Sequence, residues 1–298
     1  MTAASRPAEV RARGFAFVEG PRWHEGRLYF SDFYTHRVQS LHPDGTVEVL
    51  CEVEGQPSGL GFDPAGALLV VSMLDRRLLR LDGGALDEVA RLDHLVAGPA
   101  NDMVVDASGR AYIGSFGSGA EHGDYGPVEL VRVNPDGTVA VAASDLVFPN
   151  GMAITPDGAT LFVAETFAFR ISAFDRDGEG RLSGRRVVAS FSDEPLEGLP
   201  AIIASGVTTP DGICLDAEGA LWVGDATGNA ALRVVPGVGV VDRIDTGELA
   251  PFAVALGGDD RRDLYICAGP PLGTGDPSQS RDGVILAARV EVPGAGLP

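Results

Sequence analysis

The chain has 298 residues, of which 45% are hydrophobic, and its 42 acidic and 23 basic residues give a net charge of −19. Every basic residue is arginine, which excludes lysine Schiff-base chemistry and a lysine-bearing phosphate loop. The acidity argues against nucleic acid or an anionic membrane as a partner.

The apolar runs of the chain are short, and each reads as a strand. They lie at residues 28–30, 68–71, 111–113, 161–163, 221–223 and 264–266. Turns with Asp and Gly precede most of them, because Gly tolerates positive φ and Asp can bond its own turn. Helical periodicity is nearly absent, apart from one helical turn expected in an inserted loop at 190–205. The sequence therefore predicts an almost all-β protein.

A turn motif that leads into a strand recurs six times along the chain. Its clearest copies are Gln56-Pro57-Ser58-Gly59-Leu60, Phe148-Pro149-Asn150-Gly151-Met152 and Thr209-Pro210-Asp211-Gly212-Ile213, with looser copies at 18–21, 99–103 and 250–253. Apart from the interval that holds the inserted loop at 190–205, the copies recur about every 40–50 residues, a spacing typical of four-stranded propeller blades. Six copies predict a six-bladed β-propeller.

The ends of this propeller follow from the first and last motifs. We expect one domain over residues 15–292, with an N-terminal tail at 1–14 and a C-terminal tail at 293–298. The last strand, at 284–292, is placed to pair with the N-terminal segment near 15–18. Such pairing would close the ring and hide two sheet edges.

One residue of each motif occupies an equivalent position in its blade, which we call the slot. The six slot residues are Glu19, Ser58, Asn101, Asn150, Asp211 and Phe252. Because inner strands of a propeller run along its axis, slots from different blades should converge at the mouth of the central channel.

Four of the slots carry carboxylate or amide oxygens: Glu19, Asn101, Asn150 and Asp211. Oxygen donors without His or Cys suit hard cations such as Ca²⁺, Mg²⁺ or Mn²⁺ better than Zn²⁺. A divalent cation would also neutralise two carboxylates that are costly to bury unpaired. Asn or Asp before Gly is also a common turn former, so the prediction of a metal site depends on all four residues together.

The motifs resemble the signatures of the senescence marker protein/gluconolactonase/regucalcin family over residues 15–292. The segments that carry the resemblance are Phe17-Val18-Glu19-Gly20-Pro21-Arg22-Trp23, Asn101-Asp102-Met103-Val104-Val105-Asp106, Phe148-Pro149-Asn150-Gly151-Met152-Ala153 and Pro210-Asp211-Gly212-Ile213-Cys214-Leu215-Asp216. The resemblance implies one divalent cation on the axis, with Ca²⁺ as the first choice and Mg²⁺, Mn²⁺ or Zn²⁺ as alternatives. It places Glu19, Asn150 and Asp211 at metal-ligand positions and Asn101 at a substrate-binding position.

The function implied by this resemblance is that of a metal-dependent hydrolase, gluconolactonase-like, which opens a lactone or related cyclic ester. The cation would polarise the carbonyl, and Asp211 or a metal-bound hydroxide would act as the base. Two alternatives stay open: a propeller that binds calcium or a ligand without catalysis, and a lyase, isomerase or cyclase that uses the same metal site.

The sequence departs from the family pattern at Pro99, two residues before the Asn-Asp pair, where sugar-lactone members typically carry arginine. This departure argues against a sugar lactone and favours a less polar ring as substrate. The candidate wall residues for such a ring are Phe116, Phe148, Phe167 and Phe252.

Further side chains could assist the site. Asp102 follows a slot residue and could support it from behind, whereas His122 lies in a Gly-rich loop at 114–126 that could cap the channel. Glu165 and Thr166 follow a strand and could face the channel near Asn150.

The three cysteines, Cys51, Cys214 and Cys267, are far apart, so the chain has no Cys-x-x-Cys motif. Residues 1–13 lack the apolar core of a secretory signal, and no apolar run reaches the roughly 18–20 residues of a membrane span. An odd number of cysteines without such a signal favours reduced thiols. We therefore expect a cytoplasmic protein with a small-molecule substrate and neither nucleic acid nor membranes as partners.

Overall fold

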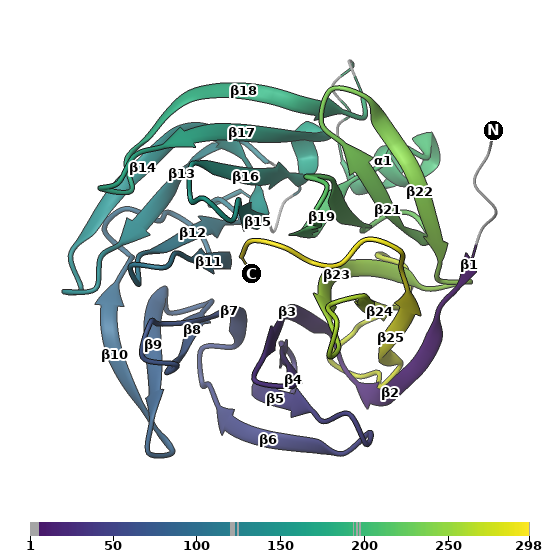
Figure 1. The fold of residues 1–298 in the computed structure, drawn as a ribbon, viewed down its shortest axis with the longest axis horizontal. Coiled ribbons are helices and arrows are strands. Elements are labelled where there is room, and N and C mark those ends of the chain that lie inside the picture. Colours follow the sequence, from purple (N-terminus) through teal and green to yellow (C-terminus); the bar gives the residue numbers. More distant parts are fainter. Residues whose placement is uncertain are drawn as a thin grey trace.

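Six β-sheets form a closed ring around a central axis, as Figure 1 shows for the computed structural model. The structure describes residues 6–119, 123, 125–192, 194, 196 and 198–297. The six-bladed propeller predicted from the repeat is thereby confirmed.

The first four blades are each built from four consecutive strands. The first holds β3 (Val18–His24), β4 (Arg27–Asp32), β5 (Arg37–Leu41) and β6 (Val47–Glu52), and the second holds β7 (Pro57–Phe62), β8 (Leu68–Ser72), β9 (Arg77–Asp82) and β10 (Ala85–Arg91). The third holds β11 (Ala100–Val105), β12 (Ala111–Ser115), β13 (Pro127–Val133) and β14 (Val139–Val147), and the fourth holds β15 (Pro149–Ile154), β16 (Thr160–Glu165), β17 (Arg170–Arg176) and β18 (Leu182–Ser190).

The last two blades also take strands from the N-terminus. The fifth holds β19 (Pro210–Leu215), β20 (Leu221–Asp225), β21 (Ala230–Val235), β22 (Gly239–Asp245) and the short β1 (Arg6–Pro7). The sixth holds β23 (Ala250–Gly257), β24 (Asp263–Gly269), β25 (Gly283–Arg289) and, outermost, β2 (Glu9–Phe15).

The ring closes where β2 pairs with β25 in antiparallel register, from Glu9 opposite Ala287 to Phe15 opposite Gly283. The last strand thus pairs with the N-terminal segment as expected, but over residues 9–15, which overlap the expected 15–18 only at Phe15. The fold therefore begins inside the segment expected to be a tail. An outermost strand is largely exposed, so β2 lacks the apolar run that marks the other strands.

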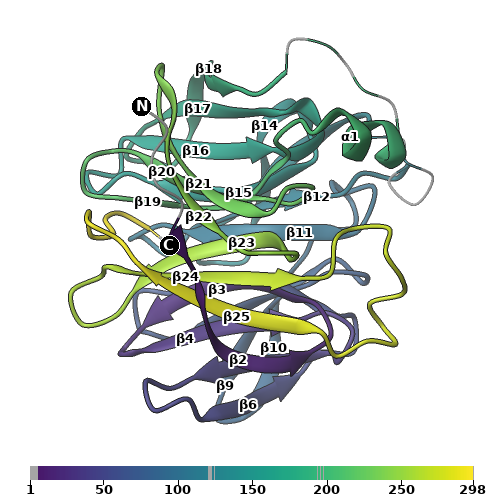
Figure 2. The ribbon, with the colours of Figure 1, turned by 90° about the vertical axis from the view of Figure 1, so that its right-hand side faces the viewer.

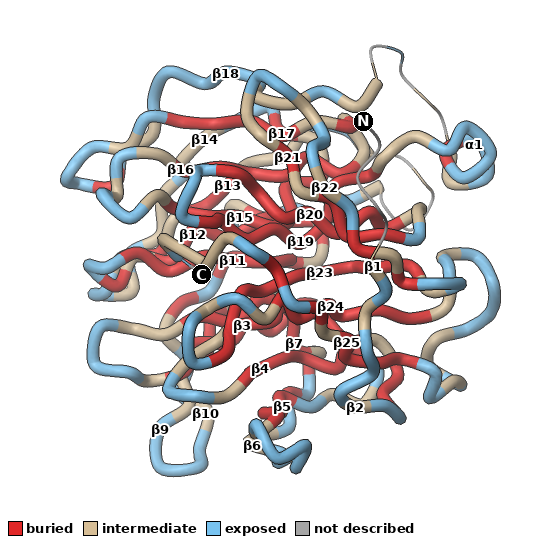
Figure 3. Tube along the Cα trace, turned by 45° about the vertical axis from the view of Figure 1, so that its right-hand side comes forward, coloured by how far each residue is buried: buried red, intermediate tan, exposed pale blue. Residues whose placement is uncertain are grey.

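Each interface between neighbouring blades is filled by its own apolar cluster. In β12, Ala111 and Ile113 pack toward the second blade, whereas Tyr112 between them packs toward the fourth. Side chains alternate across a strand, and both faces of each blade are covered. The second strand of a blade is therefore apolar without alternation, and Figure 3 shows burial concentrated around the axis.

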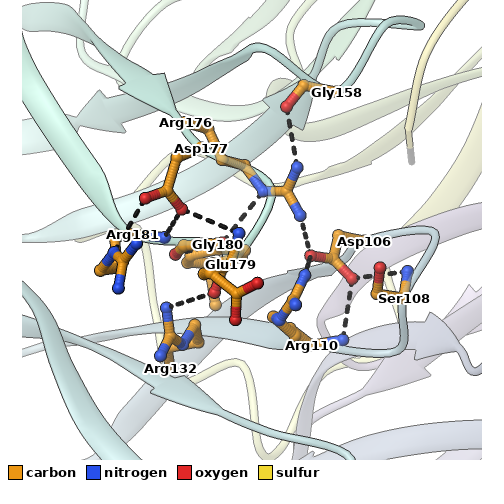
Figure 4. A network of polar contacts seen from close by, with 11 residues as sticks. Asp106, Ser108, Arg110, Arg132, Gly158, Arg176, Asp177, Glu179, Gly180 and Arg181 are labelled. Atoms are coloured by element: carbon orange, nitrogen blue, oxygen red, sulfur yellow. Dashed lines mark hydrogen bonds and ion pairs between the residues drawn. The ribbon is translucent and has the colours of Figure 1, made fainter.

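Aspartates at the turn before a second strand bond their own turn, as the sequence predicts. Asp106 Oδ1 accepts hydrogen bonds from the backbone N–H groups of Ser108 (2.8 Å) and Arg110 (2.9 Å), and Asp216 makes the equivalent pair. The other carboxylate oxygen of Asp106 binds Arg176 of the fourth blade (Figure 4). One side chain thus closes a hairpin and joins two blades.

Little of the chain is helical. The one-turn η2 (Thr166–Ala168) follows β16, and α1 (Leu199–Ser205) lies in the inserted loop where a helical turn was expected. Among the described residues, no helix is long and apolar enough to cross a membrane. All three cysteines are free thiols.

The C-terminal segment, expected to be a tail, crosses the ring and ends near its centre (Figure 1). Leu297 and Ile154 exchange two backbone hydrogen bonds of 2.7 and 3.0 Å, and Ala295 donates one of 3.0 Å to Leu215. Ile154 and Leu215 end the inner strands β15 and β19. Figure 2 shows this segment and α1 on opposite sides of the disk.

Candidate active site

An irregular register interrupts every inner strand at its slot. In β15, Pro149 pairs with Glu165 but the next regular pair is Met152 with Val163, so Asn150 lies within a bulge. The other five inner strands show a similar shift, although in β3 it begins directly after Glu19, which pairs with Ser31. A bulge re-aims the side chain it contains, which explains how the slots leave the interfaces between blades.

The glycine after the slot lets neighbouring inner strands approach closely. A Cβ on Gly151 would lie 2.4 Å from the backbone nitrogen of Ile213, and one on Gly59 would lie 2.4 Å from that of Met103. Only glycine fits such contacts without moving a backbone. The Gly of the motif therefore sets the spacing of the inner strands around the axis.

A cavity of about 270 Å³ lies where the inner strands begin. Glu19, Asn101, Asn150 and Asp211 all line it, from the first, third, fourth and fifth blades. Each of the four residues is more than nine-tenths buried. The structure thus brings the four oxygen-bearing slots together, and their roles as ligands or catalysts stay predictions.

Two of these residues are carboxyl groups in a buried setting. Burial and then the charge of Asp102 raise the pKa of Glu19 to about 8. Burial and then the charge of Glu19 raise the pKa of Asp211 well above its ordinary value. Asp211 Oδ1 has no hydrogen-bond partner in the described part of the chain. A cation between the two carboxylates would offset the cost of burying them ionised.

The two amides complete a donor set that fits a hard cation. Asn150 Nδ2 donates a 3.2 Å hydrogen bond to Thr166 Oγ1, which leaves the amide oxygen for another partner. Asn101 Nδ2 is buried without a partner among the described residues. Within those residues, no three His, Cys, Asp or Glu side chains gather as a metal centre. A cation here would therefore need the Asn150 amide oxygen beside Glu19 and Asp211.

Asp102 lies behind this cavity, where it pairs with Arg22. Arg22 Nη2 lies 2.7 Å from Asp102 Oδ1, and the guanidinium also donates to the carbonyl oxygens of Pro21 and Met103. Burial raises the pKa of Asp102, although the charge of Arg22 opposes the shift. No role for Arg22 was predicted from the sequence. The signal that could have indicated one is a charged residue in an inner strand that already carries Glu19.

A second set of lining residues lies two positions before the slots. Of the residues at this position, Phe17, Gln56, Phe148 and Thr209 line the cavity, whereas Pro99 lines a shallower pocket beside it. Of these residues, only Pro99 and Phe148 were predicted from the sequence. The same repeat that aligns the slots also aligns this second ring, so the others could have been found.

The four phenylalanines expected as walls, Phe116, Phe148, Phe167 and Phe252, all line the cavity. Phe148 adopts φ 51° and Gln56 adopts φ 66°, each immediately before the proline that starts an inner strand. Positive φ in a bulky residue costs on the order of 1–3 kcal/mol and persists where the surroundings enforce it. The ring of Phe148 is thus held at the cavity by a strained backbone.

The other side chains predicted to assist the site do not all reach the cavity. Thr166 lines the cavity as expected, but Glu165 turns away into the fourth blade, where Arg170 and Arg185 bind it at 2.8–3.0 Å. The strong cationic partners within its own blade decide this orientation. His122 lies outside the described residues.

The fold and the site together define a six-bladed β-propeller with a candidate ligand site on its axis, where the inner strands begin. Residues 17–269 match the family described as SMP-30/Gluconolactonase/LRE-like region, and the chain belongs to this family, as its motifs predict.

Two lactonases match nearly the whole chain. Pentonolactonase XacC of Haloferax volcanii is 29% identical, with 94% of this chain and 92% of the relative covered. The 6-deoxy-6-sulfogluconolactonase of Pseudomonas putida is 28% identical, with 94% and 93% covered. Among solved structures, a calcium-binding protein, regucalcin, of Agrobacterium tumefaciens superposes with a TM-score of 0.82 at 21% identity, covering 100% of this chain and 98% of that one. The structural likeness supports the propeller fold.

Proposed function

We propose that this protein is a lactone hydrolase that acts with one divalent cation, Ca²⁺ in the first instance, held by Glu19, Asn150 and Asp211. The observation that carries the proposal is the pair of buried carboxyl groups, whose pKa values are raised and one of whose oxygens, Asp211 Oδ1, lacks a partner among the described residues. Relatives named lactonases, at 28% and 29% identity over nearly full length, support the reaction class. The regucalcin described as calcium-binding supports the choice of ion.

The side chains of the cavity divide the work of hydrolysis. Asp211 Oδ1 accepts a proton from the attacking water as the new carbon–oxygen bond forms at the lactone carbonyl. When the ring carbon–oxygen bond breaks, Asp211 returns that proton to the leaving alkoxide, and the product is a hydroxy acid. Asn101 Nδ2, which has no other partner in the described residues, donates a hydrogen bond that orients the substrate.

A bound divalent cation would supply positive charge that polarises the ester carbonyl and lowers the pKa of the carboxyl groups beside it. The aromatic side chains around the cavity keep bulk water from these groups, which strengthens each electrostatic contact.

The test combines a chelator with one isosteric substitution. Hydrolysis of a panel of γ- and δ-lactones is measured with EDTA and after Ca²⁺, Mg²⁺, Mn²⁺ or Zn²⁺ is restored. We expect EDTA to abolish turnover and Asp211→Asn to lower kcat by about 10²–10⁴-fold, the usual contribution of a general base. Asp87→Asn, an exposed carboxyl on the outer strand β10, is the matched control and should change nothing.

Circular dichroism shows whether each variant is folded. Full activity of folded Asp211→Asn, or turnover insensitive to EDTA, would overturn the proposal. Calcium-dependent thermal stabilisation without turnover of any lactone would instead favour the non-catalytic binding protein. Product analysis by mass spectrometry separates hydrolysis, which adds water, from isomerisation.

A further inference from the structure

Aromatic rings line one side of the cavity from the first and sixth blades. Phe17, which precedes β3, lies with its ring centroid 4.4 Å from that of Phe252 in β23 and 5.3 Å from that of Phe33 after β4. Phe17 and Phe252 also pack in a small apolar cluster with Leu272, from the loop between β24 and β25. This side of the cavity is therefore a continuous apolar wall.

A second wall comes from the third and fourth blades. The ring centroid of Phe148 lies 4.8 Å from those of both Phe116 and Phe167, with nearly perpendicular planes. Tyr125 stacks on Phe167 at 3.6 Å and fixes it from outside. Because the blades follow one another around the ring (Figure 1), the third and fourth lie across the axis from the sixth and first. The cavity thus lies between two aromatic walls.

The only charged groups among the described residues that line the cavity are carboxyl groups. None of the described residues that line the cavity is an arginine or a histidine, and the chain has no lysine. Its carboxyl groups, Glu19 and Asp211, lie together with the two slot amides. The residues of the second ring, two positions before the slots, are all uncharged: Phe17, Gln56, Pro99, Phe148, Thr209 and Ala250.

These features disfavour two classes of lactone. A phosphate, sulfonate or carboxylate substituent would meet no cationic side chain here and would lose hydration without compensation. Some hydroxyl groups of a polyhydroxylated sugar ring would find partners among Tyr34, Gln56, Thr166, Thr209 and Thr227, but those that face the aromatic walls would lose hydration without a bond. A flat apolar ring, by contrast, can contact both walls in the offset or edge-to-face geometry that aromatic pairs prefer.

We infer that the substrate is an uncharged lactone that carries an aromatic or similarly flat apolar ring, bound between the Phe17–Phe252 wall and the Phe148–Phe167 wall with its ester group toward Asn101 and Asp211. The inference rests on the proposed lactone hydrolysis for the chemistry, but the recognition of an apolar ring stands on the walls alone. The volume of about 270 Å³ suits one small ring system, since ligand cavities commonly span about 300–1,000 Å³.

The kinetic test compares dihydrocoumarin, a neutral aryl lactone, with D-glucono-δ-lactone, using the full chain with Ca²⁺. We expect kcat/KM for dihydrocoumarin to be at least about tenfold higher after correction for the spontaneous rates. Phe167→Ala should lower that ratio by about tenfold, since one aromatic contact is worth roughly one power of ten. Phe62→Leu, which removes a ring at the far end of β7, is the control and should leave the ratio unchanged.

A second measurement separates the substrate from the reaction. The lactam analogue 3,4-dihydro-2(1H)-quinolinone has the same shape as dihydrocoumarin but resists hydrolysis, and calorimetry measures its binding in the presence of Ca²⁺. We expect binding to the unmodified chain and to Phe62→Leu, with about tenfold weaker binding to Phe167→Ala.

The outcomes distinguish the two proposals. A preference for the sugar lactone, or equal losses on both lactones in Phe167→Ala, overturns the apolar-ring inference while lactone hydrolysis stands. If neither lactone nor the wider panel is hydrolysed, the lactonase proposal fails. Lactam binding that depends on Phe167 would then support an apolar-ligand site between the two walls. Absence of lactam binding would overturn the apolar-ring inference as well.

Discussion

Arg22 Nη2 lies 2.7 Å from Asp102 Oδ1, and this ion pair joins β3 to β11 behind the candidate site. Both side chains are almost fully buried, with 5% and 6% exposed. The pair therefore links the strand that carries Glu19 to the strand that carries Asn101.

Removing one partner of this pair should destabilise the protein strongly. Arg22→Met leaves Asp102 buried without its cation, and breaking a buried pair in this way typically costs about 3–5 kcal/mol. We expect a loss of this size in the free energy of unfolding, measured by urea denaturation. Arg181→Met breaks an exposed pair with Asp177 and serves as the control, where little change is expected. A loss no larger than that of the control would contradict the structural role of the pair.

Without a divalent cation, the protein should lose stability as the pH rises. Burial and then the charge of Asp102 raise the pKa of Glu19 to about 8 from 4.5, so the folded state holds a proton that the unfolded chain releases near 4.5. The stabilisation is complete below the unfolded pKa and is lost as pH rises through the folded pKa, at no more than about 1.4 kcal/mol per pH unit per group. The raised pKa of Asp211 acts in the same direction.

The measurement is urea unfolding between pH 5.5 and 8.5, in EDTA and in CaCl₂. We expect the free energy of unfolding to fall with pH in EDTA and to change less with Ca²⁺, because the ion binds the folded carboxylates in place of protons. Glu19→Gln should reduce the fall seen in EDTA. A flat or rising profile of the unmodified chain in EDTA would count against the buried pair of carboxyl groups.

The C-terminal segment should stabilise the ring without affecting the cavity. Its backbone hydrogen bonds to Ile154 and Leu215 lie at the ends of inner strands opposite the slots, and each such bond contributes about 0.5–1.5 kcal/mol. Deleting residues 293–298 should lower the unfolding free energy while KM for any lactone substrate stays within about twofold. Leu297→Pro removes a single donor and should have a smaller effect. A raised KM, or unchanged stability, would contradict this arrangement.

The slots could be read from the sequence because ring symmetry places a similar turn and bulge in each blade, and a glycine follows the slot in four of them, at Gly20, Gly59, Gly151 and Gly212. Asn101, Asn150 and Asp211 sit in motifs whose phase is visible without coordinates, so their convergence with Glu19 follows from the fold class. Only part of the two aromatic walls was predicted from the sequence. Phe17 and Phe33 were missed because both lie outside the motif core, although Phe17 occupies an aligned position two residues before its slot.

Other features depend on contacts that no local pattern announces. The pair between Arg22 and Asp102 joins residues of different blades, so it exists only once the ring has closed. Strand β2 carries alternating charged residues because it is outermost, which made it resemble a tail. Glu165 has the sequence context of a channel residue, but the nearby guanidinium groups of Arg170 and Arg185 draw it into its own blade.

Introducing a cation beside the cavity should shift the substrate preference toward sugar lactones. Pro99 belongs to the second ring and occupies the position at which sugar-lactone members of the family typically carry arginine. It lies near Phe116 at the edge of the cavity. Its carbonyl oxygen accepts a 3.0 Å hydrogen bond from the Phe116 backbone N–H, which Pro99→Arg retains. Because hydrogen bonds to a charged donor are worth about 1.5–3 kcal/mol, Pro99→Arg should raise kcat/KM for D-glucono-δ-lactone about tenfold relative to dihydrocoumarin.

Leu74→Arg places the same charge on the shallower neighbouring pocket, at a 54% exposed site, and should leave the ratio unchanged. An unchanged ratio in Pro99→Arg, or an equal shift in Leu74→Arg, would show that position 99 does not select the substrate.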